Sequence, residues 1–362
     1  MSKSILIFPA GMPKALEYFQ KIQHESRKII GGSSLPYDPS REKYPNWIQL
    51  PYVNSLNFND ELKKVLIDLD VGGIFTPNIV VWDHLNRVLK NLAPDVVLLN
   101  NSPVDDALSG YVSAQQQASE MKEYDLSLAG QISPQPLLTH IQVASILRHS
   151  NTIPGMCDND KIYALFAIFR QTVKGDVVEI GSWWGKSAFI LNRLAHLYDV
   201  GHLLCVDPWL NENLAQGEKM VDSSSAQVDA EEAFAIFEIN LSPYSFNNVN
   251  YLRMPSVDGA NSFKKNKCIT TATFGTVEYC RKISVLHIDG NHSYESVKLD
   301  IESWFDFMLP GGWIIFDDYI WPYGNGPKLV GDEFLLQNIH RIDVAFVMGS
   351  ALFIQLSLVD AG

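Results

Sequence analysis

The sequence has few cysteines and no long apolar run, the features that mark disulfide-rich, metal-binding and membrane proteins. Only four of its 362 residues are cysteines, and they show neither a Cys-x-x-Cys pairing nor a metal-binding spacing. No apolar run approaches the length of a membrane span, and the start, MSKSILIFPAG, is too short in apolar residues for a signal peptide. We therefore expect reduced cysteines in a cytoplasmic protein that has no membrane partner.

An excess of positive charge is also absent. The chain has 41 acidic residues against 28 lysines and arginines, a net charge of −13. A phosphate backbone requires a basic face, so we expect no nucleic-acid partner. With 46% hydrophobic and 19% charged residues, the composition is that of a globular protein. The length suits two domains, because single cores stop growing near about 250–300 residues.

Strand-like and helix-like stretches alternate through the first hundred residues. SILIFPA and RKIIGGS read as strands, and MPKALEYFQKIQHES between them reads as an amphipathic helix. This alternation predicts βαβ units and a parallel sheet, so we expect a smaller α/β Rossmann-like domain over residues 1–125. This part resembles the Rossmann-like domain that precedes ATP-grasp folds, although no ATP-grasp domain follows. A ligand pocket and a module for oligomerisation or substrate shaping both stay open.

A second alternating series follows a polar stretch. We expect a helical connection over residues 126–149 and a second domain over residues 150–362, in which GDVVEIG, HLLCVDPW, NVNYLRM, ISVLHIDG and GWIIFDDY are strands. RIDVAFVMG and ALFIQLSLV close the chain as two strands joined by a short turn. The pattern predicts a Rossmann-like parallel sheet that ends in an antiparallel hairpin.

The glycine turn in VVEIGSWWGKSA is the first candidate site. Backbone N–H groups at a helix start, approached through glycines, suit a nucleotide or a carboxylate. As a P-loop the stretch has three residues where the motif needs four, and Ile180 stands where the first glycine belongs. The adenosylmethionine-binding turn, acidic-x-Gly-x-x-x-Gly, fits Glu179, Gly181 and Gly185.

The cofactor assignment extends to the next two strands. Asp207 is placed to accept both ribose hydroxyls, Trp209 to cover the adenine, and Ser256 to meet the adenine edge. The predicted residues for S-adenosylmethionine are Glu179, Gly181, Ser182, Gly185, Ser187, Asp207, Trp209 and Ser256.

Acidic residues end two further strands. Asp289 and His292 follow ISVL within HIDGNHSYESVKLD, and GWIIF ends in Asp317 and Asp318. The carboxyl ends of parallel strands form the edge where α/β sheets bind ligands. Three carboxylates suit a hard cation rather than zinc, whereas ordinary solvated strand ends are the alternative. As strand ends contribute little packing, replacing Asp317 or Asp318 is expected to leave the fold intact.

Together, VVEIGSWWGKSA, CVDPW, HIDGNHSYESVKLDIESW and LPGGWIIFDDY resemble the macrocin O-methyltransferase family over roughly residues 150–357. That resemblance implies a class I, S-adenosylmethionine-dependent enzyme that methylates a sugar or natural-product hydroxyl with a divalent metal. It implies that Asp289, Asp317 and Asp318 bind Mg²⁺ or Mn²⁺, and that His292 is the general base beside catalytic Asp289.

Two features depart from that family. The turn contains the bulky pair Trp183–Trp184, and residues 264–282 read as an insertion before the Asp289 strand. Both put the shape of the small-molecule acceptor in doubt. A cephalosporin-hydroxylase-like oxygenase, a P-loop-like phosphotransferase and a non-catalytic binding module remain alternatives, and self-association into a homo-oligomer stays open. Asp300, on the helix after Asp289, is expected on a solvated face.

Overall fold

A computed structural model describes residues 3–123, 126, 128, 130–213, 222–223 and 227–358. Internal contacts divide the chain into two compact units, Met1–Val112 and Ser113–Gly362. We predicted domain boundaries near residues 125 and 150. A division by contacts does not test whether these parts fold separately, so these boundaries stay a prediction. Among the described helices, none combines the length and the apolar character needed to cross a bilayer.

The first unit is built on a parallel sheet. Its five described strands are ordered β3-β2-β1-β4-β5, and every pairing is parallel. One apolar core lies under α2 and α3, and another lies under α1. The strands are β1 (Ser4–Ile7), β2 (Ile29–Ser33), β3 (Trp47–Gln49), β4 (Val71–Phe75) and β5 (Val97–Leu98), and the helices are α1 (Pro13–Ile22), α2 (Phe58–Asp68) and α3 (Ile79–Leu92).

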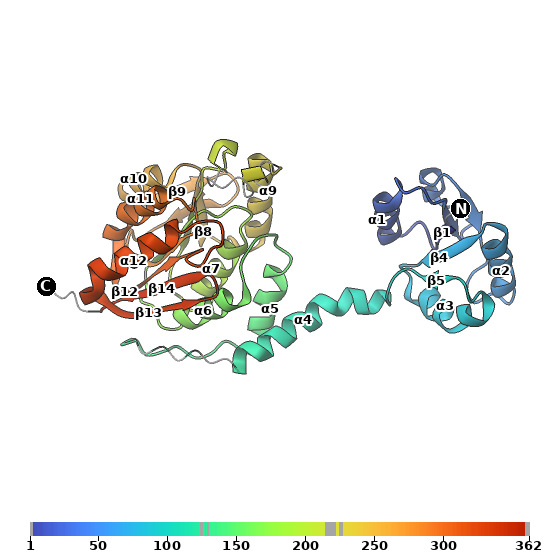
Figure 1. Cartoon of the computed structure of the whole chain (residues 1–362), viewed down its shortest axis with the longest axis horizontal. Coiled ribbons are helices and arrows are strands. Elements are labelled where there is room, and N and C mark those ends of the chain that lie inside the picture. The colour runs from blue at the N-terminus through green and yellow to red at the C-terminus, as the bar shows by residue number, and fades with distance from the viewer. Residues whose placement is uncertain are drawn as a thin grey trace. The chain divides into compact units, whose positions relative to one another are not determined.

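The second unit contains a larger sheet of order β13-β14-β12-β11-β6-β7-β8 (Figure 1). Strand β14 runs antiparallel to both of its neighbours, and the other pairings are parallel. The strands are β6 (Asp176–Ile180), β7 (Leu203–Val206), β8 (Val249–Leu252), β11 (Ile283–Ile288), β12 (Met308–Phe316), β13 (Ile342–Met348) and β14 (Ala351–Leu356). The predicted Rossmann-like sheet with a terminal hairpin is confirmed.

Helices cover both faces of this sheet, because its central strands are apolar on both sides. Val177 and Val285 belong to the core under α5, α6, α7 and α9, whereas Val178 and Leu286 belong to the core under α10, α11 and α12. Strands buried on both faces are typical of parallel sheets. The helices are α5 (His140–Ser150), α6 (Asn159–Phe169), α7 (Lys186–Leu197), α9 (Ala230–Leu241), α10 (Ser256–Lys265), α11 (Tyr294–Trp304) and α12 (Gly326–Asn338).

Several elements differ from the sequence-based expectation. The stretch read as an insertion contains an antiparallel hairpin, β9 (Cys268–Thr271) and β10 (Gly275–Glu278), whose inward residues Ile269 and Val277 are buried. Within the expected helical connection, residues 126–149, the structure describes most of α5, whereas α4 (Pro103–Glu123) ends before that stretch begins.

Strand register sets the position of the site. Ile180 of β6 pairs with Val206 of β7 on one side and with Ile288 of β11 on the other, and Ile288 pairs with Phe316 of β12. These four residues are the last of their strands. The residues that follow them therefore emerge side by side at the carboxyl edge of the sheet.

Candidate active site

The glycine turn after β6 packs directly against the turn after β11. Gly181 has a φ of 82°, and a Cβ there would lie 2.0 Å from the backbone oxygen of Asp289. Gly185, with a φ of 87°, is the N-cap of α7. An L-residue is disfavoured in this left-handed region, and no side chain fits between the turns. Glycine at position 181 is therefore what allows the glycine turn and the acidic edge to meet.

We expect Gly181→Ala to lower the free energy of unfolding by more than the roughly 1–2 kcal/mol that a left-handed alanine costs. The excess arises because its Cβ would meet the Asp289 backbone. Gly275→Ala is the matched control, since Gly275 has a φ of 71° but nothing within 4 Å of an added Cβ. Urea unfolding of both variants measures the difference, and equal losses would contradict the tight packing of the two turns.

Glu179 lies under the glycine turn and is completely buried. Its Oε2 accepts a hydrogen bond from Ser182 Oγ at 2.6 Å, and its Oε1 lies 3.1 Å from His287 Nδ1. Burial disfavours the charged imidazole of His287, but hydrogen bonds to Asp317 and Glu179 outweigh it and raise the His287 pKa. Glu179 thus holds the glycine turn from below. Its predicted role, under the amino-acid end of the cofactor, stays a prediction.

Asp207 fastens the same turn from the next strand. Its Oδ2 accepts hydrogen bonds from the N–H groups of Ser182 and Trp183, each at 3.0 Å, and its Oδ1 accepts one from Trp209 N at 2.7 Å. Burial raises the pKa of Asp207, and these backbone donors act against that rise. A carboxylate oxygen can accept two hydrogen bonds, so Oδ1 retains capacity for a further donor such as a ribose hydroxyl.

Trp209 lies in the core rather than at the surface of the site. The residue is 1% exposed, its Nε1 donates to Trp183 O at 2.9 Å, and its ring packs against Phe234, Phe237 and Tyr251. A ring enclosed in this way offers no open face to stack on an adenine. The structure therefore gives no support to the place predicted for Trp209 over the cofactor.

The two remaining predicted serines have structural contacts. Ser187 is buried in the first turn of α7. Ser256 begins α10, and its Oγ accepts a hydrogen bond from Trp304 Nε1 at 3.0 Å. Asp300 also interacts with Ser256 and is only 6% exposed, so the expectation of a solvated face is wrong. Burial raises the pKa of Asp300 to about 7.

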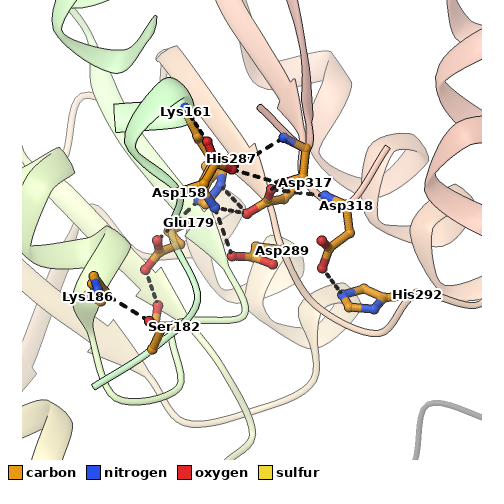
Figure 2. Close-up of polar contacts among 12 residues, drawn as sticks. Asp158, Lys161, Glu179, Ser182, Lys186, His287, Asp289, His292, Asp317 and Asp318 are labelled. Atoms are coloured by element: carbon orange, nitrogen blue, oxygen red, sulfur yellow. Dashed lines mark hydrogen bonds and ion pairs between the residues drawn. The ribbon is translucent and has the colours of Figure 1, made fainter. Parts of the chain in front are cut away.

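The three strand-end aspartates lie together, but in unequal surroundings (Figure 2). The Asp317 side chain is 3% exposed, whereas those of Asp289 and Asp318 are 22% and 24% exposed. Asp318 has a φ of 49°, so the chain turns sharply after Asp317 and the two carboxylates point in different directions. Burial and the Asp317 charge raise the pKa of Asp289 well above its usual value and that of Asp318 to about 6.

His292, which the sequence spacing placed beside Asp289, contacts Asp318. Its Nε2 lies 3.2 Å from Asp318 Oδ2, and its ring packs edge-on against Trp321 at 4.5 Å between centroids. Burial lowers the His292 pKa to about 4, although the Asp317 charge acts in the opposite direction. The imidazole is therefore neutral at neutral pH. Nδ1 is buried, so Nε2 is the ring nitrogen that faces the acidic edge.

Two residues of the site escaped the sequence analysis. Lys161, in the first turn of α6, contacts Asp317 Oδ2, and its Nζ lies 3.9 Å from Asp289 Oδ2. His287 Nε2 lies 3.4 Å from the same Asp317 oxygen. The sequence did contain a sign of both residues. Lys161 begins the mostly apolar stretch KIYALFAIF, and His287 lies within the mostly apolar stretch ISVLHI. Buried groups of this kind need partners.

Comparison with known proteins agrees with this geometry. Residues 178–319 match the family model described as a methyltransferase domain. This segment is similar to a methyltransferase domain. It begins within β6 and ends after Asp318, so it contains the glycine turn, Asp207 and the acidic edge together. The resemblance expected from the motifs is confirmed.

Solved structures with similarity to the chain include several methyltransferases. The O-methyltransferase NovP is 20% identical, with a TM-score of 0.38 over 70% of this chain and 100% of that one. Calicheamicin methyltransferase CalS11 is 14% identical, with a TM-score of 0.42 over 71% and 94%. MycE methyltransferase, in complex with Mg, SAH and mycinamycin VI, is 15% identical, with a TM-score of 0.31 over 52% and 47%. Such distant similarities assign no residues in the methyltransferase domain, and no curated protein matches the chain.

Proposed function

We propose that the chain transfers a methyl group from S-adenosylmethionine to a hydroxyl of a small molecule, in particular a sugar or a glycosylated natural product. The observation that carries this proposal is the direct packing of the glycine turn on the acidic edge, at Gly181 and Asp289. A cofactor on the turn and an acceptor at the edge would be neighbours, which methyl transfer requires. The match to the methyltransferase domain model supports it, and the sugar acceptor rests on the motif resemblance.

The turn has the features that the cofactor needs. Gly181 and Gly185 present backbone without side chains, and Asp207 has acceptor capacity left at Oδ1. When bound, S-adenosylmethionine supplies an electrophilic methyl group on a sulfonium. Glu179 and Ser182 fix the turn from below, so its shape is set before any ligand arrives. We assign the turn and Asp207 to cofactor binding on these grounds.

The acidic edge fits a divalent cation only in part. Donor atoms of Asp289, His292 and Asp318 lie within 4.8 Å of one another, as do those of His287, Asp289 and Asp317. Oxygen donors suit Mg²⁺ or Mn²⁺. Asp289 and Asp318 are the accessible carboxylates, while Asp317 is buried against Lys161. Asp289 and Asp318 would therefore hold the ion. Such a cation lowers the pKa of a hydroxyl and orients it.

His292 is assigned as the general base. Its imidazole is neutral, and its Nε2 lies at the acidic edge, 3.2 Å from Asp318 Oδ2, whereas its Nδ1 is buried. Nε2 is therefore the nitrogen that would accept the proton of the acceptor hydroxyl. Trp321, packed against the ring, limits its rotation. The base, the acidic edge and the glycine turn are thus all held by neighbouring strand ends.

Calorimetry tests the cofactor assignment directly. We expect the chain to bind S-adenosylmethionine and its demethylated product, and Asp207→Ala to weaken both by roughly 10- to 100-fold, because a charged hydrogen bond contributes about 1.5–3 kcal/mol. Asp199→Ala, at an exposed position, is the matched control. Tight binding of ATP without binding of S-adenosylmethionine would replace this proposal with the phosphotransferase.

A further inference from the structure

A lysine lies within the acidic edge. Lys161 is 1% exposed, and Figure 2 shows its ammonium directed at the carboxylate of Asp317. The same Nζ lies 3.9 Å from Asp289 Oδ2. Lys161 therefore places a positive charge between two of the three aspartates, where a cation shared by all three would also have to lie.

The hydrogen bonds of Asp317 show how completely it is engaged. Its Oδ2 accepts from Lys161 Nζ and lies 3.4 Å from His287 Nε2, and its Oδ1 accepts from Asp318 N at 2.9 Å and from Ser350 Oγ at 3.3 Å. Three hydrogen bonds and the neighbouring imidazole occupy most of the carboxylate. Asp289 and Asp318 are in a different position, since both carboxyl groups stay partly exposed. Donor atoms of Asp317, His287 and Asp289 lie within 4.8 Å of one another, so a metal ion would have to displace Lys161 in order to bind Asp317.

The start of α6 holds Lys161 in place. Asp158, the N-cap of the helix, accepts a hydrogen bond from Lys161 N at 2.8 Å. Asp158 also accepts from Ser350 N and Oγ, each at 3.3 Å, in the turn between β13 and β14. This turn supplies Ser350 to Asp317 as well. Lys161 and Asp317 are therefore fastened by the same turn, and neither can withdraw alone.

We infer that Lys161 is a resident counter-ion that keeps Asp317 out of metal coordination, so that of the three aspartates only Asp289 and Asp318 bind a divalent cation. The inference rests on the metal role proposed above, but not on methyl transfer. Two consequences follow. The wild-type protein binds a divalent ion weakly, because it offers two carboxylates beside a fixed positive charge. Removing Lys161 releases a third carboxylate and strengthens binding.

Titration with Mn²⁺, without cofactor or acceptor, tests this inference. Calorimetry would compare the full-length wild type with Lys161→Met, for which we expect at least about tenfold tighter binding because a positive charge near the ion is lost. Lys174→Met is the matched control: it removes an equal charge from an exposed ion pair with Asp199 and should leave affinity unchanged. The double variant Lys161→Met/Asp317→Asn removes the released carboxylate and should lose the gain.

Each outcome decides the inference. Unchanged or weaker binding by Lys161→Met overturns it, and so does a gain that survives in the double variant, because Asp317 would then not be the released ligand. If Lys161→Met unfolds without metal, recovery of its melting temperature with Mn²⁺ supports the inference, and failure to recover while the double variant folds overturns it. If no variant binds Mn²⁺, the metal role falls with it, whereas binding of S-adenosylmethionine would leave the proposed methyl transfer standing.

Discussion

His292→Ala is expected to lower kcat by about 10²–10⁴-fold, the usual contribution of a positioned general base. The imidazole is neutral, its Nε2 lies 3.2 Å from Asp318 Oδ2, and no other described histidine except the buried His287 lies at this edge. Binding of S-adenosylmethionine and Mn²⁺ should persist, because neither the glycine turn nor the two accessible carboxylates are altered. A fall in kcat with unchanged cofactor affinity is the signature of a lost base.

The pH profile separates a base from a merely structural residue. Burial lowers the His292 pKa to about 4, so the base is unprotonated above that value and the wild-type rate should not lose its base until the pH falls toward 4. In His292→Ala this fall in rate toward pH 4 should disappear. The rate should recover partly at high pH, because the acceptor hydroxyl then ionises without a base. His340→Ala, at an exposed position, should match the wild type. A wild-type rate in His292→Ala would remove the residue from the chemistry.

The position of the site was predictable because strand ends are a local property of the sequence. The runs VVEI, LLCV, SVLHI and WIIF are mostly apolar, and each is followed by a glycine or an aspartate. In a parallel sheet such ends share one edge, so Gly181, Asp207, Asp289 and Asp317 could be expected to meet there. The register of the strands brings them to adjacent positions, as that reasoning requires.

Burial of individual polar residues could not be predicted in the same way. Lys161 lies 156 residues before its partner Asp317, and no local pattern records which helix covers a given strand end. Trp209 follows a strand-end acid, which suggested an exposed place over a ligand, but residues from α9 and β8 enclose its ring. Asp300 was assigned to solvent from its helix alone, whereas α10 covers it through Ser256. These environments arise from packing between distant segments.

The expectation that replacing a strand-end aspartate leaves the fold intact therefore applies to Asp318 but does not extend to Asp317. Asp317→Ala should lower the free energy of unfolding by about 3–5 kcal/mol, because removing one partner of a buried pair leaves the other charge uncompensated. Here the charge left behind is that of Lys161, 1% exposed, with His287 beside it. Asp318→Ala is the matched control, and its 24% exposed carboxylate should cost little. Urea unfolding of both variants measures the difference.

The pH dependence of stability gives the same prediction a second test. Burial opposes ionisation of Asp317, but Lys161 and His287 outweigh it and hold its pKa well below the usual value. A carboxyl whose pKa is lowered on folding contributes stability above its unfolded pKa, near 3.8, and this stability is lost as the pH falls toward the folded pKa. The wild type should therefore lose stability below about pH 4 more steeply than Asp317→Ala. Two results would show that the buried pair with Lys161 contributes nothing to the fold. One is an equal loss of stability below about pH 4 in the wild type and Asp317→Ala, and the other is equal urea stability of Asp317→Ala and Asp318→Ala.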